Sequence, residues 1–353
     1  MKRILVMLPV ALVLLLVAAV SAVTAPAPAS ATSPVPGGYH VTKKFPVGGE
    51  GGWDYLTFDG DGHRLFITRG TRVIVVDPDS GKVTGEIPGL QGTHGVALAP
   101  DLGRGFISDG RANKVVIFDL KTLKTLGDVA TGQNPDAILY DPPSHLVFAF
   151  NGRSADATAI DGATGKVTGT ISLGGRPEFA ATDLKGSVFV NIEDKSEVVS
   201  LSTAKLAVVN RWKLAPCEEP SGMAIDRNHQ RLVIGCSNKM AAIVDTTSGK
   251  VVATPPIGQG VDANGFDPGT NLGFASNGEG TLTVIRADSA DKWTVAENVP
   301  TQKGARTMAL DDKTHTVYLV TAEFGPPPPA TKEQPRPRGA MVKDSFTVLV
   351  VGR

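Results

Sequence analysis

The chain has 353 residues and carries equal numbers of basic and acidic side chains, 35 of each. This neutral balance argues against the strongly positive field with which proteins attract the phosphates of nucleic acids. The length exceeds that of an ordinary single domain, so the chain is two domains, one large domain or an array of repeats. The spacing of the sequence patterns has to decide between these.

The N-terminus predicts a secretory signal peptide. Two basic residues precede an apolar run over residues 4–20, and an Ala-Ser-Ala tract follows as a cleavage site. We expect residues 1–31 to be the signal peptide and 32–38 to be a flexible segment. The mature protein would then be periplasmic or secreted, without a transmembrane span and as a monomer. An uncleaved anchor is the alternative.

The two cysteines, Cys217 and Cys236, are the next observation that depends on the compartment. An exported chain meets oxidising conditions, in which paired cysteines form disulfides. We therefore expect a Cys217–Cys236 disulfide. Metal binding by the two thiolates is the weaker alternative, because no Cys-x-x-Cys motif is present.

A short apolar strand that runs into a polar, glycine-bearing loop recurs about every 40 residues. Turns of the form Asp-x-x-Ser/Thr-Gly-Lys follow in several units, at 77–82, 161–166 and 245–250. The aromatic residue of the strand, or its substitute, marks seven units: Phe66, Phe106, Phe148, Phe189, Val233, Phe274 and Tyr318. Four antiparallel strands per unit predict an all-β fold, a seven-bladed β-propeller over residues 39–353.

The two ends of the array predict how the ring closes. The seventh unit stops after its third strand, near residues 346–351, and a strand pattern at 40–47 precedes the first unit. The N-terminal strand should therefore complete the last blade. A Pro-rich insertion at 325–340 interrupts that blade, because proline cannot donate to a strand ladder.

The apolar strand, the Pro-Asp turn at Ala99-Pro100-Asp101, the Phe-Ile-Ser/Thr strand and the Thr-Gly-Lys turn together resemble the repeats of YVTN/YncE-type seven-bladed propellers of exported bacterial proteins. The resemblance covers nearly all of the mature chain and implies architecture. It does not choose a function, because lactonases, lyases, nucleic-acid binders and scaffolds share this fold class.

One position per blade, just before or within the innermost strand, should face the channel at one mouth. We call these residues the ring; they are Asp54, His94, Asp136, Glu178, Ser221, Asp262 and Arg306. A purely structural repeat could use small polar residues throughout, so this charged set predicts a ligand site. Equally, these carboxylates could only bind neighbouring loops, Arg306 or water.

The leading functional prediction is a binding protein that holds a small ligand, a cation or a protein partner at this acidic mouth. The predicted ligand-binding residues are Asp54, His94, Asp136, Asn151, Arg153, Glu178, Glu219, Asp262, Asn277, Glu279 and Arg306. A divalent cation such as calcium would suit the carboxylates Asp54, Asp136, Glu178 and Asp262.

Two further functions stay open. A lactonase-like hydrolase or lyase would use His94 as acid or base, Glu178 to orient it and Arg306 to stabilise an oxyanion. Binding of single-stranded nucleic acid would need a basic rim, for which Arg69 and Arg153 are candidates, and the near-neutral charge argues against it.

Overall fold

The computed structural model describes residues 1, 37–331, 337 and 339–353. The predicted signal peptide, apart from Met1, lies outside the described residues. Within the described part of the chain, no helix has the length and apolar character needed to cross a membrane. From residue 37 onward the structure is β-strand and turn, with three single-turn 3₁₀ segments at Pro100–Leu102, Gly110–Ala112 and Glu193–Lys195.

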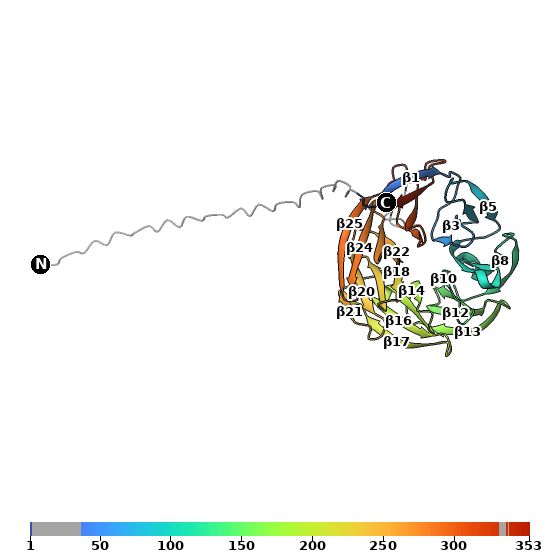
Figure 1. Ribbon diagram of the computed structural model, residues 1–353, viewed down its shortest axis with the longest axis horizontal. Coiled ribbons are helices and arrows are strands. Elements are labelled where there is room, and N and C mark those ends of the chain that lie inside the picture. Colours follow the sequence, from blue (N-terminus) through green and yellow to red (C-terminus); the bar gives the residue numbers. More distant parts are fainter. Residues whose placement is uncertain (2–36, 332–336, 338) are drawn as a thin grey trace. The chain divides into compact units, whose positions relative to one another are not determined.

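Seven four-stranded antiparallel sheets surround a common axis, which confirms the predicted seven-bladed propeller (Figure 1). From innermost to outermost strand, the sheets are β2 (Leu56–Asp59), β3 (Arg64–Thr68), β4 (Val73–Val76), β5 (Val83–Ile87); β6 (Thr93–Ala99), β7 (Arg104–Asp109), β8 (Lys114–Asp119), β9 (Thr125–Ala130); β10 (Pro135–Asp141), β11 (Leu146–Asn151), β12 (Asp156–Asp161), β13 (Lys166–Ser172); β14 (Pro177–Thr182), β15 (Ser187–Ile192), β16 (Glu197–Ser202), β17 (Ala207–Lys213); β18 (Pro220–Asp226), β19 (Arg231–Cys236), β20 (Met240–Asp245), β21 (Val251–Ala253); β22 (Val261–Asp267), β23 (Leu272–Asn277), β24 (Thr281–Ser289), β25 (Lys292–Pro300); and β26 (Met308–Asp311), β27 (Thr316–Thr321), β28 (Thr347–Gly352), β1 (His40–Pro46).

The last sheet closes the ring as predicted. Strand β1 pairs antiparallel with β28, from His40 opposite Gly352 to Pro46 opposite Thr347. In Figure 1 the blue N-terminal strand lies beside the red C-terminal one. Each end of the propeller thus supplies the hydrogen-bond partners that the other lacks, which leaves no open blade.

The repeated aromatic positions build the core between neighbouring blades. All seven marker residues are buried, and Phe66 of the first blade contacts Phe118 of the second with ring centroids 5.9 Å apart. The Asp-containing turns cap the blades as expected: Asp77 accepts a hydrogen bond from the Ser80 amide at 2.8 Å, and Gly81 adopts a φ of 70°. A Cβ at Gly81 would collide with Phe45 at 2.3 Å, so glycine is required there on two grounds.

The predicted disulfide between Cys217 and Cys236 is confirmed. Cys217 lies in the loop before β18 and Cys236 ends β19, and both are buried. The bond therefore ties the loop entering the fifth blade to that blade's second strand.

Arg69 fastens the closing segment to the first blade and is not part of a basic rim. Its side chain is only 1% exposed, and its guanidinium donates hydrogen bonds to the carbonyl oxygens of Gly48, Gly49, Glu50 and Gly51. It also lies 3.7 Å from the ring centroid of Phe346, just before β28. Burial, with a smaller contribution from the charge of Arg72, lowers the pKa of Arg69 to about 10.

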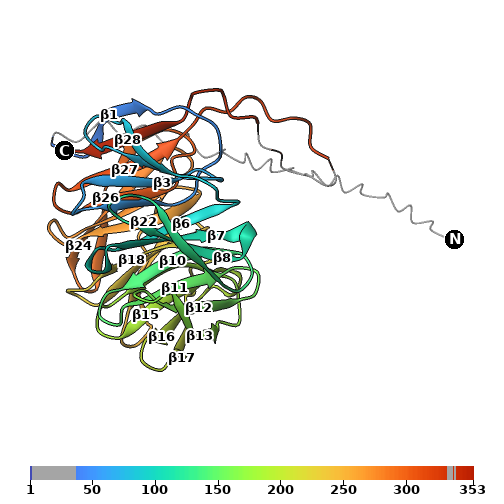
Figure 2. The same cartoon turned by 90° about the vertical axis from the view of Figure 1, so that its right-hand side faces the viewer.

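The Pro-rich insertion leaves the last blade after β27 and returns before β28 (Figure 2). Its base is held by two backbone hydrogen bonds, from Gly325 to Ala340 and from Val342 to Glu323. Phe324 at this base packs against Trp53, with ring centroids 6.0 Å apart, and Trp53 also contacts Phe346. Trp53 therefore packs at the junction of the first and last blades.

Replacing Arg69 by lysine should destabilise the propeller strongly. A lysine ammonium cannot reproduce the planar fork that binds four carbonyl oxygens, so buried acceptors lose their partners at a cost of about 3 kcal/mol. Arg72→Lys is the matched control, because exposed Arg72 makes one hydrogen bond, to the carbonyl of Glu50, and pairs with Glu86. Urea unfolding should show a large loss for Arg69→Lys alone, and equal losses for both variants would contradict this role.

Candidate functional site

The innermost strands carry the ring residues to one mouth of the propeller. Each ring residue lies within the first two positions of an innermost strand or shortly before it, at equivalent places in the seven blades. Since neighbouring strands run the same way around the axis, these side chains converge. The structure divides them into three groups, described in turn: Asp54 with His94 and Asp136, Glu178 with Glu193, and Asp262 with Arg306 and Ser221.

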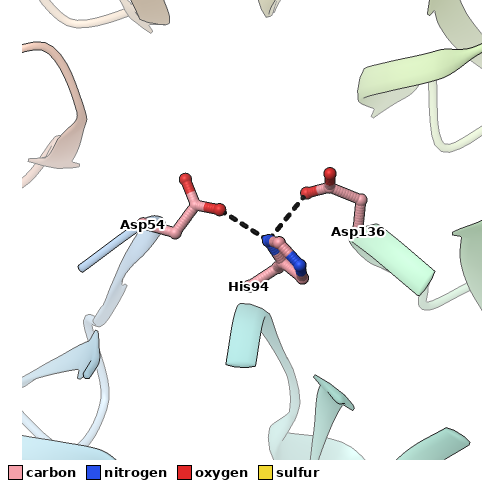
Figure 3. A group of neighbouring side chains, drawn as sticks. All are labelled: Asp54, His94 and Asp136. Atoms are coloured by element: carbon pink, nitrogen blue, oxygen red, sulfur yellow. Dashed lines mark hydrogen bonds and ion pairs between the residues drawn. The ribbon is translucent and has the colours of Figure 1, made fainter. Parts of the chain in front are cut away.

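The first group places one imidazole between two carboxylates. His94 Nδ1 lies 2.7 Å from Asp54 Oδ2 and 3.4 Å from Asp136 Oδ1, and Figure 3 shows the three side chains pointing toward one another from neighbouring strands. Their side chains are 26%, 23% and 21% exposed respectively, so solvent and ligands can reach all three. We call Asp54, His94 and Asp136 the triad.

The triad shifts the protonation of its own members. Burial alone would lower the pKa of His94, but the hydrogen bond with Asp54 and the charges of Asp136 and Asp54 outweigh it, so the pKa is raised. Burial raises the pKa of Asp136 to about 6; the charge of His94 opposes this shift, and those of Asp54 and Asp262 add to it. Protons are therefore held where negative charge is crowded.

Glu178 shows the same crowding more strongly. Burial, the charges of Asp136 and Glu193 and a hydrogen bond with Glu193 raise the pKa of Glu178 to about 10. Glu193 in turn pairs with Arg176, at the start of the fourth blade. Glu178 is therefore a neutral carboxylic acid at physiological pH, able to donate a hydrogen bond.

The third group is internally neutralised. Arg306 forms an ion pair with Asp262, and the Ser221 hydroxyl donates a hydrogen bond to the other oxygen of Asp262 at 3.0 Å. Burial still raises the pKa of Asp262, against the opposing charge of Arg306. The guanidinium of Arg306 is thus already engaged by a carboxylate of its own chain.

Two aromatic residues that the sequence reasoning passed over lie beneath the ring. Tyr55 of the first blade and Phe179 of the fourth contact each other across the axis, with ring centroids 4.4 Å apart. Tyr55 also packs against the cluster between the third and fourth blades, and Phe179 against the cluster that contains Met308. The pair therefore forms a floor under the acidic groups.

A sequence signal for this floor exists in the position after each ring residue. Five of the seven blades place a small or short side chain there, namely Gly95, Ala137, Gly222, Ala263 and Thr307. Only Tyr55 and Phe179 depart from this pattern. Two large rings at an otherwise small position have room only if they extend toward the axis.

The remaining predicted ligand residues do not join the ring. Asn151 and Asn277 are fully buried, and their amide groups donate to Thr158 and Thr283 of neighbouring strands, so they brace their blades. Arg153, Glu219 and Glu279 are exposed on loops of the same face. These three are available to a large partner and lie outside the three groups.

The opposite mouth has a different character. A cavity of about 440 Å³ lies there, lined largely by apolar residues of β2, β6 and β10. The turn histidines also lie at this end: His145 bonds Asp101 of the preceding blade, and His315 bonds Asp267 of its preceding blade. They tie blades together, as their turn positions suggested, and His94 is the one histidine of the ring.

Comparison with known proteins supports the fold alone. No family model matches the chain, and no curated protein matches it. A chain of hydrazine synthase from Kuenenia stuttgartiensis superposes with a TM-score of 0.67 at 16% identity, covering 77% of this chain and 93% of that one. At this identity the likeness establishes the propeller architecture and leaves the function to the site itself.

Glu178 should make the stability of the protein fall as pH rises. The folded chain keeps the Glu178 proton up to a pH of about 10, whereas the unfolded chain loses it near the ordinary value of 4.5. Between these values the free energy of unfolding decreases with pH by about 1.4 kcal/mol per unit for this one proton. Glu178→Gln removes the titration, so its stability should depend less on pH and exceed that of the wild type at pH 8.

Urea unfolding from pH 5 to pH 9, without added divalent cations, measures this effect. Glu218→Gln, which changes an exposed carboxylate on the same face, is the control and should follow the wild type. Parallel pH profiles for Glu178→Gln and the wild type would show that Glu178 titrates normally.

Proposed function

We propose that this propeller is a binding protein that holds a positively charged ligand at its acidic mouth. The observation that carries the proposal is the imbalance of charge in the ring. Four carboxyl groups from four blades, Asp54, Asp136, Glu178 and Asp262, meet there with one imidazole and one guanidinium. The guanidinium is already used by Asp262, which leaves the other carboxyl groups to share His94.

The raised pKa values of Asp136 and Glu178 support a cationic ligand. A site that raises the pKa of its own carboxyl groups favours any positive charge placed among them, because that charge relieves their repulsion. Without a ligand, protons supply this charge. A cation that displaced them would gain the attraction of two further ionised carboxylates in a partly desolvated setting.

We propose further that the protein is exported and belongs with the YVTN/YncE-type propellers. The apolar N-terminal run, the repeat pattern and the disulfide support this proposal, since disulfides persist outside the reducing cytoplasm.

A hydrolase or lyase is the second candidate, favoured by the neutral state of Glu178. A protonated carboxyl group beside an imidazole that a carboxylate orients has the composition of an acid and base pair. The ion pair of Arg306 with Asp262 weighs against the oxyanion role predicted for Arg306. Nucleic-acid binding loses Arg69 from its basic rim and faces the acidic ring.

Cation binding should appear as a rise in thermal stability that depends on the ring. With Ca²⁺, Mn²⁺, Zn²⁺ and spermidine tested separately near neutral pH, at least one should raise the melting temperature of the tag-free protein by binding the folded state. The double variant Asp136→Asn with Glu178→Gln should lose this response. Asp312→Asn with Glu218→Gln, two exposed carboxylates outside the ring, should keep it. No response to any of the four cations would contradict the proposal.

A further inference from the structure

The donor atoms of the triad are arranged as metal ligands are. One nitrogen, His94 Nδ1, faces carboxylate oxygens of Asp54 and Asp136 at 2.7 and 3.4 Å, and the three donor atoms lie within 4.8 Å of one another. An imidazole N–H can point at one acceptor only, so a proton on Nδ1 satisfies one carboxylate and leaves the other short of a full hydrogen bond. A metal ion in place of that proton would satisfy all three.

The spacing of these atoms favours a small ion. Two donors at right angles, each about 2.1 Å from an ion, lie roughly 3.0 Å apart, whereas the longer bonds to calcium place them roughly 3.4 Å apart. The observed separations of 2.7 and 3.4 Å bracket the smaller value. One imidazole with two carboxylates also suits Zn²⁺ or Mn²⁺ better than Ca²⁺, which takes oxygen ligands.

An independent observation points to a ligand at the same place. The hydroxyl oxygen of Tyr55, in the floor under the ring, is buried and has no hydrogen-bond partner among the described residues. Burial, and then the charges of Asp136, Glu178, Asp54 and Asp262, raise the pKa of Tyr55 well above its usual range. This donor therefore lies among the carboxyl groups without bonding any of them, as it would if it served a water or an oxygen ligand held above the floor.

A third feature shapes the space around the imidazole. Gly110, in the loop after β7, lies against the far edge of His94, where an added Cβ would come within 2.7 Å of both Cδ2 and Nε2. The glycine lets the ring sit in the orientation that turns Nδ1 toward the two carboxylates. The corresponding glycine of the next blade, Gly152, has only ordinary contacts around an added Cβ, the nearest being Asn134 at 3.5 Å.

We propose that the triad binds one small divalent ion, Zn²⁺ or Mn²⁺, through His94 Nδ1 and one oxygen each of Asp54 and Asp136. The proposal rests on the proposed function and names the ligand of that site. Its remaining coordination positions face the floor and the mouth, where the Tyr55 hydroxyl hydrogen-bonds a water on the ion. Glu178 and Asp262, predicted from the sequence as ligands of a harder cation, stay outside the coordination sphere. Asp262 is bound by Arg306, and Glu178 keeps its proton.

Isothermal titration of the tag-free, metal-stripped mature chain tests this assignment directly. Zn²⁺ and Mn²⁺ should bind with a stoichiometry of one, and Ca²⁺ at least about tenfold more weakly. His94→Ala, Asp54→Asn and Asp136→Asn should each weaken binding by about tenfold or more, because each removes a ligand. His63→Ala is the control: His63 pairs with Asp79 at 3.0 Å on the opposite face, and its loss should leave the titration unchanged.

Two further variants separate the metal site from general folding effects. Gly110→Ala should weaken Zn²⁺ binding by about tenfold by displacing the imidazole, whereas Gly152→Ala should not change it. Tyr55→Phe should keep the fold and the stoichiometry while changing the electron paramagnetic resonance spectrum of bound Mn²⁺. Circular dichroism of every variant before titration establishes that it is folded.

The outcomes distinguish this assignment from the broader proposal. If spermidine binds in a way that needs Asp136 while Zn²⁺ and Mn²⁺ do not bind, the metal assignment is wrong and the cation-binding function stands. If Zn²⁺ binds with equal affinity to the wild type and to folded His94→Ala, the triad is not the site. If none of the tested cations binds, both proposals fall.

Discussion

The pairing of β1 with β28 is the interaction on which the rest of the molecule depends. It joins residues more than 300 positions apart along the chain and turns a row of blades into a closed ring. Closure fixes the first blade against the last, and Arg69 and Phe346 reinforce that junction from both sides. Only in a closed ring do the first residues of the innermost strands meet at one mouth, so the site exists because the ends of the chain pair.

Closure also concentrates charge that an open array would keep apart. Asp54, His94 and Asp136 belong to three consecutive blades, and Glu178 and Asp262 come from blades further around. The structure neutralises this charge in three ways: an ion pair at Asp262, a retained proton at Glu178 and a shared imidazole in the triad. The third arrangement leaves a carboxylate incompletely satisfied, and it lies above a floor whose buried hydroxyl has no partner among the described residues. Both features suit a bound ion.

The fold was predictable from the sequence because its signals are local and repeated. Strand length, the Asp-capped turns and the spacing of the marker aromatics each recur seven times, and the missing fourth strand of the last unit pointed to closure by residues 40–47. The disulfide followed from the compartment and from the presence of only two cysteines.

The site was predictable only in part, because counting along repeats places a residue at the mouth without giving its contacts. The count correctly placed His94 and the carboxyl groups together, yet it could not show that Arg306 is consumed by Asp262 or that Arg69 is buried under the closing segment. It also carried Asn151 and Asn277 into the ligand set, although their neighbours bury them within the blades. The Tyr55 and Phe179 floor depends on packing across the axis, which no single repeat contains.

A crystal structure of the mature protein grown with Zn²⁺, with diffraction measured at the zinc absorption edge, tests the central claim most directly. The account predicts one anomalous peak between Asp54, His94 and Asp136, about 2.0 to 2.2 Å from the His94 Nδ1 atom. A triad without an anomalous peak, in crystals whose protein is otherwise ordered at the ring, would contradict it.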